Sequence, residues 1–221
     1  MKTRFIFTVF TLLATAMFGF SCSEEMTGTD ELLNEMKIGE LAAGCPVSGT
    51  ITGEEAAAIL FMYDEEKMAR DLYAEFYKMY KIPVFKNISK SENVHMQAVG
   101  SLVKAFGLKY NGTDKPGEFV NPEIARLYSQ LVEMGKESLT GALKAGALVE
   151  ETDILDLQDE LQSAGNASVK RVFTNILAGS ENHLRAFVNQ LKFRKTIYEP
   201  VLIKDLDYYK AILSNTTGTR K

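Results

Sequence analysis

Apolar residues recur at the three- and four-residue spacing of amphipathic helices along most of the chain after residue 50. This pattern predicts four long helices, over residues 52–81, 87–106, 137–163 and 168–192. The first of them opens with Thr52 and Glu55, which form a capping-box motif, and it must stop before Pro83. The sequence therefore predicts an all-α fold.

A shorter helix is expected between the second and third long ones. Asn121, Pro122 and Glu123 supply an N-cap, a proline at the first helical position and a first-turn acid, and the helix runs to about residue 134. It carries no inward ionisable cluster. A long connection of this kind is required by an up-down four-helix bundle with one crossover helix between main helices 2 and 3.

The second long helix places two ionisable residues, Glu92 and His95, in its apolar stripe. The stripe consists of Ile88, Glu92, His95, Val99, Leu102 and Phe106. Burying a carboxylate and an imidazole without partners would cost several kcal/mol, so hydrogen bonds, ion pairs or a metal must compensate. Two simpler interpretations stay open: Glu92 could be the N3 partner of a Ser89 cap, and His95 could be a core histidine bonded to a carbonyl.

The third and fourth long helices carry further inward ionisable residues. Glu150 and Asp153 share an apolar face of the third helix, although an exposed EETD run is the alternative. On the fourth helix His183 lies on the buried stripe. The residue three positions before it is Ser180, whereas Glu181 points to another side of the helix.

The first long helix has two faces that compete for the core, one with Glu65 and one with Glu66. Periodicity alone favours Glu65 as the buried carboxylate. An exposed acidic pair is the simpler alternative, because a glutamate is seldom buried.

These side chains together suit a site for two metal ions. Its predicted ligands are Glu66 (with Glu65 as the alternative), Glu92, His95, Glu150, Asp153 and His183. The chain has two histidines, and both fall on buried stripes. Four ionised carboxylates balance two divalent cations, whereas an empty site would crowd like charges. Iron is the favoured metal, with manganese or zinc as alternatives.

Composition limits the class of protein. The 221 residues, 46% of them hydrophobic, can bury one good-sized core. The formal net charge is −4, and no long run of lysine and arginine occurs, which excludes a nucleic-acid-binding protein.

The N-terminus has the pattern of an export signal. Lys2 and Arg4 precede the apolar run FIFTVFTLLATAMFGF, which is short for a membrane span. The stretch GFSC resembles a bacterial lipobox, and the SEE after it resembles an export tag for outer-membrane or cell-surface lipoproteins. We therefore expect a lipoprotein signal peptide at 1–22 with Cys22 as the lipidation site; a plain cleaved signal peptide is the alternative. A flexible tether (23–50), the bundle (51–195) and a C-terminal extension (196–221) complete the predicted organisation.

Several motifs resemble a known family. They are FMYDEEKMARDLYAEFYKMYKIPVFKNISKSENVHMQAV, GEFVNPEIARLYSQLVEMG, GALVEETDILDLQ and GSENHLRAFVNQL. They resemble the ferritin-like family known as domain of unknown function 2202, over about residues 55–210, and more distantly the rubrerythrin-type di-iron proteins. The resemblance implies a ferritin-like bundle with Glu66, rather than Glu65, at the metal. The sequence departs from the di-iron pattern at Ser180, where the fourth helix of those proteins usually has the glutamate of Glu-x-x-His, and Asp153 could supply the lost carboxylate.

Two functions remain open from the sequence. The first is a di-iron oxidoreductase, in which metals bridged by Glu92 and Glu150 reduce oxygen or peroxide or oxidise iron. No C-x-x-C module is present to deliver electrons, so a reductant must come from outside. The alternative is a lipoprotein scaffold that holds metal or a partner without catalysis and meets the membrane only through its lipid anchor.

Overall fold

The computed structural model of the chain describes residues 47–214. The predicted signal peptide, Cys22 and the predicted tether up to residue 46 lie outside the described residues. All regular secondary structure in the described part is helical, without strands, as the hydrophobic pattern predicts. Its helices are α2 (Gly53–Tyr80), α3 (Pro83–Ala105), α4 (Pro122–Glu137), α5 (Leu139–Ser163), α6 (Ala167–Phe193) and α7 (Leu206–Leu213).

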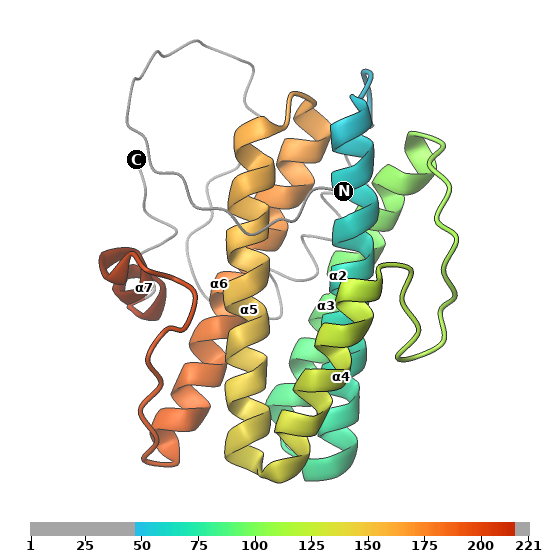
Figure 1. Cartoon of the computed structure of the whole chain (residues 1–221). Coiled ribbons are helices and arrows are strands. Elements are labelled where there is room, and N and C mark those ends of the chain that lie inside the picture. Colours follow the sequence, from blue (N-terminus) through green and yellow to red (C-terminus); the bar gives the residue numbers. More distant parts are fainter. Residues whose placement is uncertain (1–46, 215–221) are drawn as a thin grey trace. The chain divides into compact units, whose positions relative to one another are not determined.

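The four long helices pack as two antiparallel pairs. Helix α2 packs mainly against α3, and α5 packs mainly against α6, while α3–α6 and α2–α5 contacts join the pairs. The chain runs down the view in α2, up in α3, up again in α5 and down in α6 (Figure 1). Helix α4 packs against α5 and α2 and lies between α3 and α5 in the chain, where the crossover helix was expected.

The start of α3 differs from the prediction. The helix begins at Pro83, not at Asn87, because the fixed φ of proline suits the first helical position. Glu92 therefore lies well inside the helix, and the Ser89 hydroxyl donates to the carbonyl of Arg70 instead of capping. The interpretation of Glu92 as part of a helix cap is wrong.

The apolar core consists of two clusters with a polar layer between them. One cluster includes Phe76, Phe85 and Phe187, and the other includes Met62, Leu102 and Phe173. The predicted ligands on each long helix lie near the boundary between the two clusters: Glu66, Glu92, His95, Glu150, Asp153 and His183. The polar layer therefore lies inside the helical core, with apolar packing on both sides of it.

Buried charges on the outer side of α2 hold the long connection between α3 and α4. The Lys67 ammonium donates to the carbonyls of Lys115 and Glu118 at 2.8 and 3.0 Å and pairs with Asp71 at 2.8 Å. The Asp64 carboxylate accepts from the Tyr110 hydroxyl at 2.6 Å and from the Asn121 amide at 2.7 Å. These contacts fix a segment that has no regular structure of its own.

Two further buried carboxylates, Glu55 and Glu151, lie outside the polar layer and form hydrogen bonds that connect different segments of the chain. Glu55 forms the predicted capping box with Thr52 and accepts from the amides of Gly165 and Asn166, which ties the start of α2 to the α5–α6 turn. Glu151, fully buried, accepts from the Tyr198 hydroxyl and from three backbone amides of residues 201–203. The segment after α6 is therefore anchored to α5.

None of the helices formed by residues 47–214 is both long enough and apolar enough to cross a membrane.

Candidate metal centre

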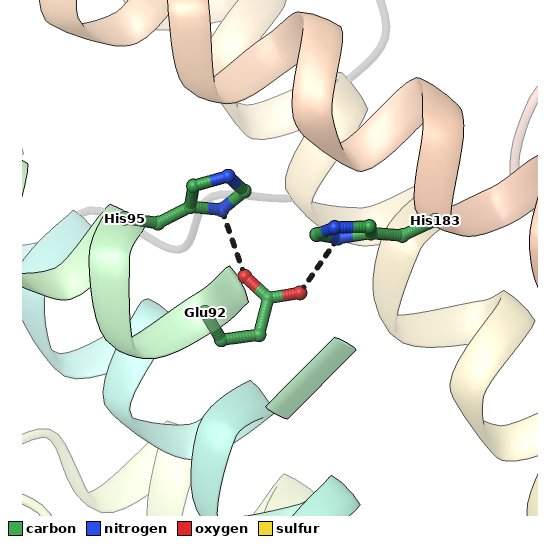
Figure 2. A group of neighbouring side chains, drawn as sticks. All are labelled: Glu92, His95 and His183. Atoms are coloured by element: carbon green, nitrogen blue, oxygen red, sulfur yellow. Dashed lines mark ion pairs between the residues drawn. The ribbon is translucent and has the colours of Figure 1, made fainter. Parts of the chain in front are cut away.

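The polar layer is centred on Glu92, which lies between the two imidazoles of the chain. One carboxylate oxygen, Oε2, is 2.8 Å from His95 Nδ1, and the other, Oε1, is 2.8 Å from His183 Nδ1 (Figure 2). Glu92 and His95 come from α3 and His183 from α6, so the contact joins the two helix pairs. All three side chains are buried.

A second carboxylate approaches each imidazole. Glu66 Oε2 from α2 lies 3.4 Å from His95 Nδ1, and Glu150 Oε2 from α5 lies 3.6 Å from His183 Nδ1. Each Nδ1 atom therefore faces one shared carboxylate and one of its own. Side chains from all four long helices therefore lie together in the interior, namely Glu66, Glu92, His95, Glu150 and His183. The exposed alternatives for the DEEK and EETD runs are wrong, because these acids are buried.

Many of these atoms are close together without forming hydrogen bonds. Among the described residues, no aligned hydrogen-bond partner exists for Glu66 Oε1, Glu92 Oε1, Asp153 Oδ1, either ring nitrogen of His95 or Nδ1 of His183. Buried polar atoms are normally hydrogen-bonded, and leaving one unpaired costs about 1–3 kcal/mol. His95 is therefore not a core histidine bonded to a carbonyl. Its Nδ1 atom and that of His183 instead lie at ion-pair distance from Glu92, and these atoms could act as ligands to a cation.

Burial and mutual repulsion shift the ionisation of the acids. Burial, with repulsion from Asp153, raises the pKa of Glu66 well above its usual range. Burial, with repulsion from Glu92, raises the pKa of Glu150 to about 7. Burial, with repulsion from Glu150, raises the pKa of Asp153 to about 8. These groups hold protons more tightly than exposed acids, and a divalent cation would replace those protons.

The glutamate between the two rings behaves differently. Burial alone would raise the pKa of Glu92, but His183 and His95 lower it below its usual range. Burial would lower the pKa of His183, but Glu92 and Glu150 raise it to about 10. Glu92 and Glu66 likewise raise the pKa of His95 against the effect of burial. Without a metal, protons on the rings thus partly neutralise the acids.

The two adjacent glutamates of α2 are both buried but face different groups. Glu66 faces His95 and Glu92. The Glu65 carboxylate instead bonds to Asp156, and burial and repulsion from Asp156 raise its pKa well above the usual range. Glu66 therefore contacts an imidazole of the centre, whereas Glu65 lies behind it beside a second acid.

Asp153 contacts the serine that lies three residues before His183 on α6. The fully buried Ser180 hydroxyl lies within hydrogen-bond distance of Asp153 Oδ2 and of the carbonyl of Ile176, and it can donate its one hydrogen to either. Asp153 Oδ1 has no hydrogen-bond partner among residues 47–214. The serine therefore positions one oxygen of the aspartate and leaves the other unpaired.

Three supporting residues orient these groups. The Tyr73 hydroxyl donates to Glu150 Oε1 at 2.5 Å, and Ser91 Oγ lies 2.9 Å from His183 Nε2. Gly179 gives the His95 ring its space, because a Cβ atom there would lie 2.5 Å from Nε2. The sequence analysis identified neither Ser91 nor Gly179. The run of small residues at Gly179 and Ser180 inside an apolar helix was the available signal.

Three ligand atoms lie close enough together to hold one metal ion. Glu92, His95 and His183 each offer one atom, and these atoms lie within 4.8 Å of one another. Imidazole Nδ1 with carboxylate oxygen is a donor set that suits iron, manganese and zinc. Ser91 contacts Nε2 of His183, so that Nδ1 of the same ring faces the carboxylates. A hydrogen bond to the second ring nitrogen commonly orients a histidine that binds a metal. The residues present fit a metal ion.

The described part of the chain is thus an all-α protein with a buried Glu-His-His group that could hold a metal ion. The chain belongs to the family described as an uncharacterized protein domain, DUF2202, whose pattern matches residues 55–215. It is similar to the uncharacterized protein MJ0754 of Methanocaldococcus jannaschii, with 40% identity over 171 residues that cover 75% of this chain and 90% of the relative.

A solved structure shows the same arrangement of helices. The crystal structure of hypothetical protein MJ0754 from Methanococcus jannaschii DSM 2661 matches with a TM-score of 0.75 at 38% sequence identity. The match covers 77% of this chain and 98% of the crystallised chain. The fold of the described helices is therefore shared with an experimentally determined relative.

Proposed function

We propose that the chain is a ferritin-like four-helix-bundle protein that binds two divalent metal ions, iron above all, in a carboxylate-bridged centre. One position would use Glu66, Glu92 and His95. The other would use Glu150, Asp153 and His183, with Glu92 shared between them. With iron bound, we propose that the protein is an oxidoreductase acting on oxygen or peroxide.

One observation carries this proposal: a single buried carboxylate lies 2.8 Å from the Nδ1 atoms of both histidines. An ion pair with a purely structural role would consist of one imidazole and one carboxylate. Here two imidazoles and four further acids, including Glu65, crowd the same layer, where burial without compensation is costly. Two divalent cations would neutralise this excess of acids and would use the atoms that lack hydrogen bonds.

The chain's own residues would set up the chemistry in four ways. Glu92 would be shared by the two metal ions, and His95 and His183 would each bind one of them. The two apolar clusters would keep bulk water out of the centre. Tyr73 would hold Glu150 in place through its short hydrogen bond. Iron bound at such a centre supplies one-electron transfer to oxygen or peroxide, and an external reductant returns the electrons.

Metal content is the first test. Purified protein should contain about two metal ions per chain by elemental analysis, and Glu92→Gln should lower this content by at least half, because the shared ligand loses its charge. Glu55→Gln is the matched control, since it removes a buried carboxylate outside the polar layer. A metal-free wild type, or equal loss in both variants, would refute the site.

Catalysis needs a separate assay. Iron-loaded protein should consume peroxide or oxygen in the presence of a reductant, and Glu92→Gln protein should not. Two tightly bound irons with no consumption would instead support the metal-holding scaffold.

We also propose, from the sequence at the N-terminus, that the protein is exported as a lipoprotein through Cys22. Labelling with a fatty acid in a bacterial host should mark the wild type and not Cys22→Ser. Cleavage without labelling of the wild type would favour the plain signal peptide.

A further inference from the structure

The C-terminal end of α6 exposes two large apolar side chains among basic ones. Phe193 is 82% exposed and Ile197 is 86% exposed, the highest values among the large hydrophobic residues described. Their neighbours Lys192 and Lys195 are exposed, and Arg194 is half-buried. We call Lys192, Phe193, Arg194, Lys195 and Ile197 the α6 tip.

The α6 tip is a fixed turn. The amides of Arg194 and Thr196 donate to the Leu191 carbonyl, and the amide of Lys195 donates to the carbonyl of Lys192. Lys195 adopts a left-handed conformation, with φ at 57°, which ends the helix. Just beyond, Tyr198 is held by Glu151. The backbone on both sides of the tip is thus anchored, and Phe193 and Ile197 are held outward.

The charges of the α6 tip are uncompensated. Neither Lys192 nor Lys195 forms an ion pair with any residue in the range 47–214, and the acid nearest to them in sequence, the exposed Glu199, pairs with neither. Arg194 bonds to Gln190 and lies over the Phe193 ring. The turn between α2 and α3 adds the exposed Lys81, and the C-terminal ends of α2 and α6 lie at the same end of the bundle (Figure 1).

We propose that the α6 tip docks on the surface of a membrane that contains anionic lipid. Exposed aromatic and aliphatic side chains beside lysine and arginine are the combination that inserts shallowly at a lipid interface. A second copy of the tip fits less well, because apposing two tips would bring like charges together. An anionic headgroup layer complements the cations, and the acyl boundary accepts Phe193 and Ile197.

This docking differs from the lipid anchor expected at Cys22. It uses folded residues at one end of the bundle, and it holds whether or not the chain is acylated. It would also orient the bundle, with the C-terminal ends of α2 and α6 toward the lipid.

The absence of tryptophan from the chain permits a site-specific test. Phe193→Trp in the full chain places a single reporter on the α6 tip. Its fluorescence should shift to the blue and become protected from a soluble quencher on addition of phosphatidylglycerol-containing vesicles, but not with vesicles of phosphatidylcholine alone. Phe106→Trp, at the C-cap of α3, is the matched control and should not respond.

Charge reversal tests the electrostatic part of the proposal. Lys192→Glu with Lys195→Glu, in the Phe193→Trp chain, should raise the lipid concentration for half-maximal response at least tenfold, because each basic side chain near an anionic surface contributes about fivefold. Both lysines are exposed, so the fold should be unaffected.

Three results would overturn the proposal: no response of the tip reporter to phosphatidylglycerol, an equal response of Phe106→Trp, or a shift that grows with protein concentration in the absence of vesicles. The last would assign the tip to contact between copies of the chain.

Discussion

At the scale of single residues, adjacent side chains in the polar layer have different surroundings. Glu66 and Glu65 are neighbours in sequence and are both buried, yet one faces an imidazole and the other faces Asp156. Hydrophobic periodicity favoured Glu65, and the family resemblance favoured Glu66. Periodicity could not decide because both stripes of α2 are buried against other helices: Glu66 faces His95 of α3, and Glu65 faces Asp156 of α5.

Substituting these two glutamates should separate their roles. Glu66→Gln should reduce bound metal by about one ion per chain, because a glutamine oxygen is a much weaker ligand than a carboxylate. Glu65→Gln should leave two ions bound, because an amide can still donate to Asp156. Elemental analysis of both proteins is the measurement, and the reverse order of effects would place Glu65 at the centre.

Asp153 and Ser180 allow a second residue-scale prediction. If Asp153 supplies the carboxylate that α6 lacks, Asp153→Ala should lose one metal ion. The double variant Asp153→Ala with Ser180→Glu should regain it, because the carboxylate would then reach the same place from α6, three residues before His183. Calorimetric titration with metal should resolve two sites in the wild type, one in Asp153→Ala and two in the double variant.

The metal stoichiometry of Asp153→Ala decides whether Asp153 is a ligand. A wild-type stoichiometry for Asp153→Ala would show that the aspartate is only a hydrogen-bond partner of the serine. Asp153→Asn serves as a less disruptive companion, because it keeps the acceptor for the Ser180 hydroxyl while removing the charge.

At the scale of elements, the centre depends on how closely α3 and α6 approach. The His95 ring lies against the backbone of α6 at Gly179, where a methyl group would come within 2.5 Å of Nε2. The helices can approach this closely because the residue has no side chain. Small residues thus decide the position of an imidazole that another helix carries.

Gly179→Ala should therefore displace His95 and weaken metal binding. We expect a loss of about 1–3 kcal/mol in unfolding free energy from overpacking, together with at least a tenfold loss of metal affinity. Gly53→Ala is the matched control, because a Cβ atom there meets nothing within 4 Å. Chemical denaturation and metal titration of both variants would check this. Normal metal affinity in Gly179→Ala would show that the ring position does not matter.

At the scale of the whole molecule, the sequence predicted the local features, namely the helices and the residues that point inward. It did not predict the contacts between distant segments, which depend on packing. The helices, the capping box at Thr52 and the inward positions of Glu92, His95, Glu150 and His183 follow from the 3.6-residue period. Glu151 faces away from the apolar stripe, as its position predicts, and is buried all the same. The Glu151 side chain is buried by a segment about 50 residues further along the chain, and no local sequence pattern identifies that contact.

The same limit applies to the centre itself. A period predicts that a residue points inward, but not which residues of other helices it meets. The contact between Ser91 and His183, 92 residues apart in sequence, had no local signal. The convergence of ligands was inferred from the inventory of inward acids and histidines, and the packing of two helix pairs supplies the distances.

The metal-free protein should lose stability as the pH rises from about 5 to 8. Glu150 and Asp153 have folded pKa values of about 7 and about 8, above the usual value near 4. The folded state therefore binds more protons than the unfolded chain in this window, and its stability falls as pH rises. His183, with its pKa raised to about 10, acts in the same direction, because the stabilisation present below about 6.5 is lost as pH rises toward 10.

Bound metal should reverse this trend, because cations replace the protons and bind more tightly once the ligands are deprotonated. Metal at about 100 times its dissociation constant should add about 2.7 kcal/mol to the unfolding free energy. Thermal unfolding followed by circular dichroism, with and without chelator, should show a melting temperature that falls with pH for the metal-free protein alone. Glu150→Gln with Asp153→Asn should flatten that fall, since the groups that retain the protons are gone. An identical pH dependence with and without metal would mean that these acids do not meet the cation.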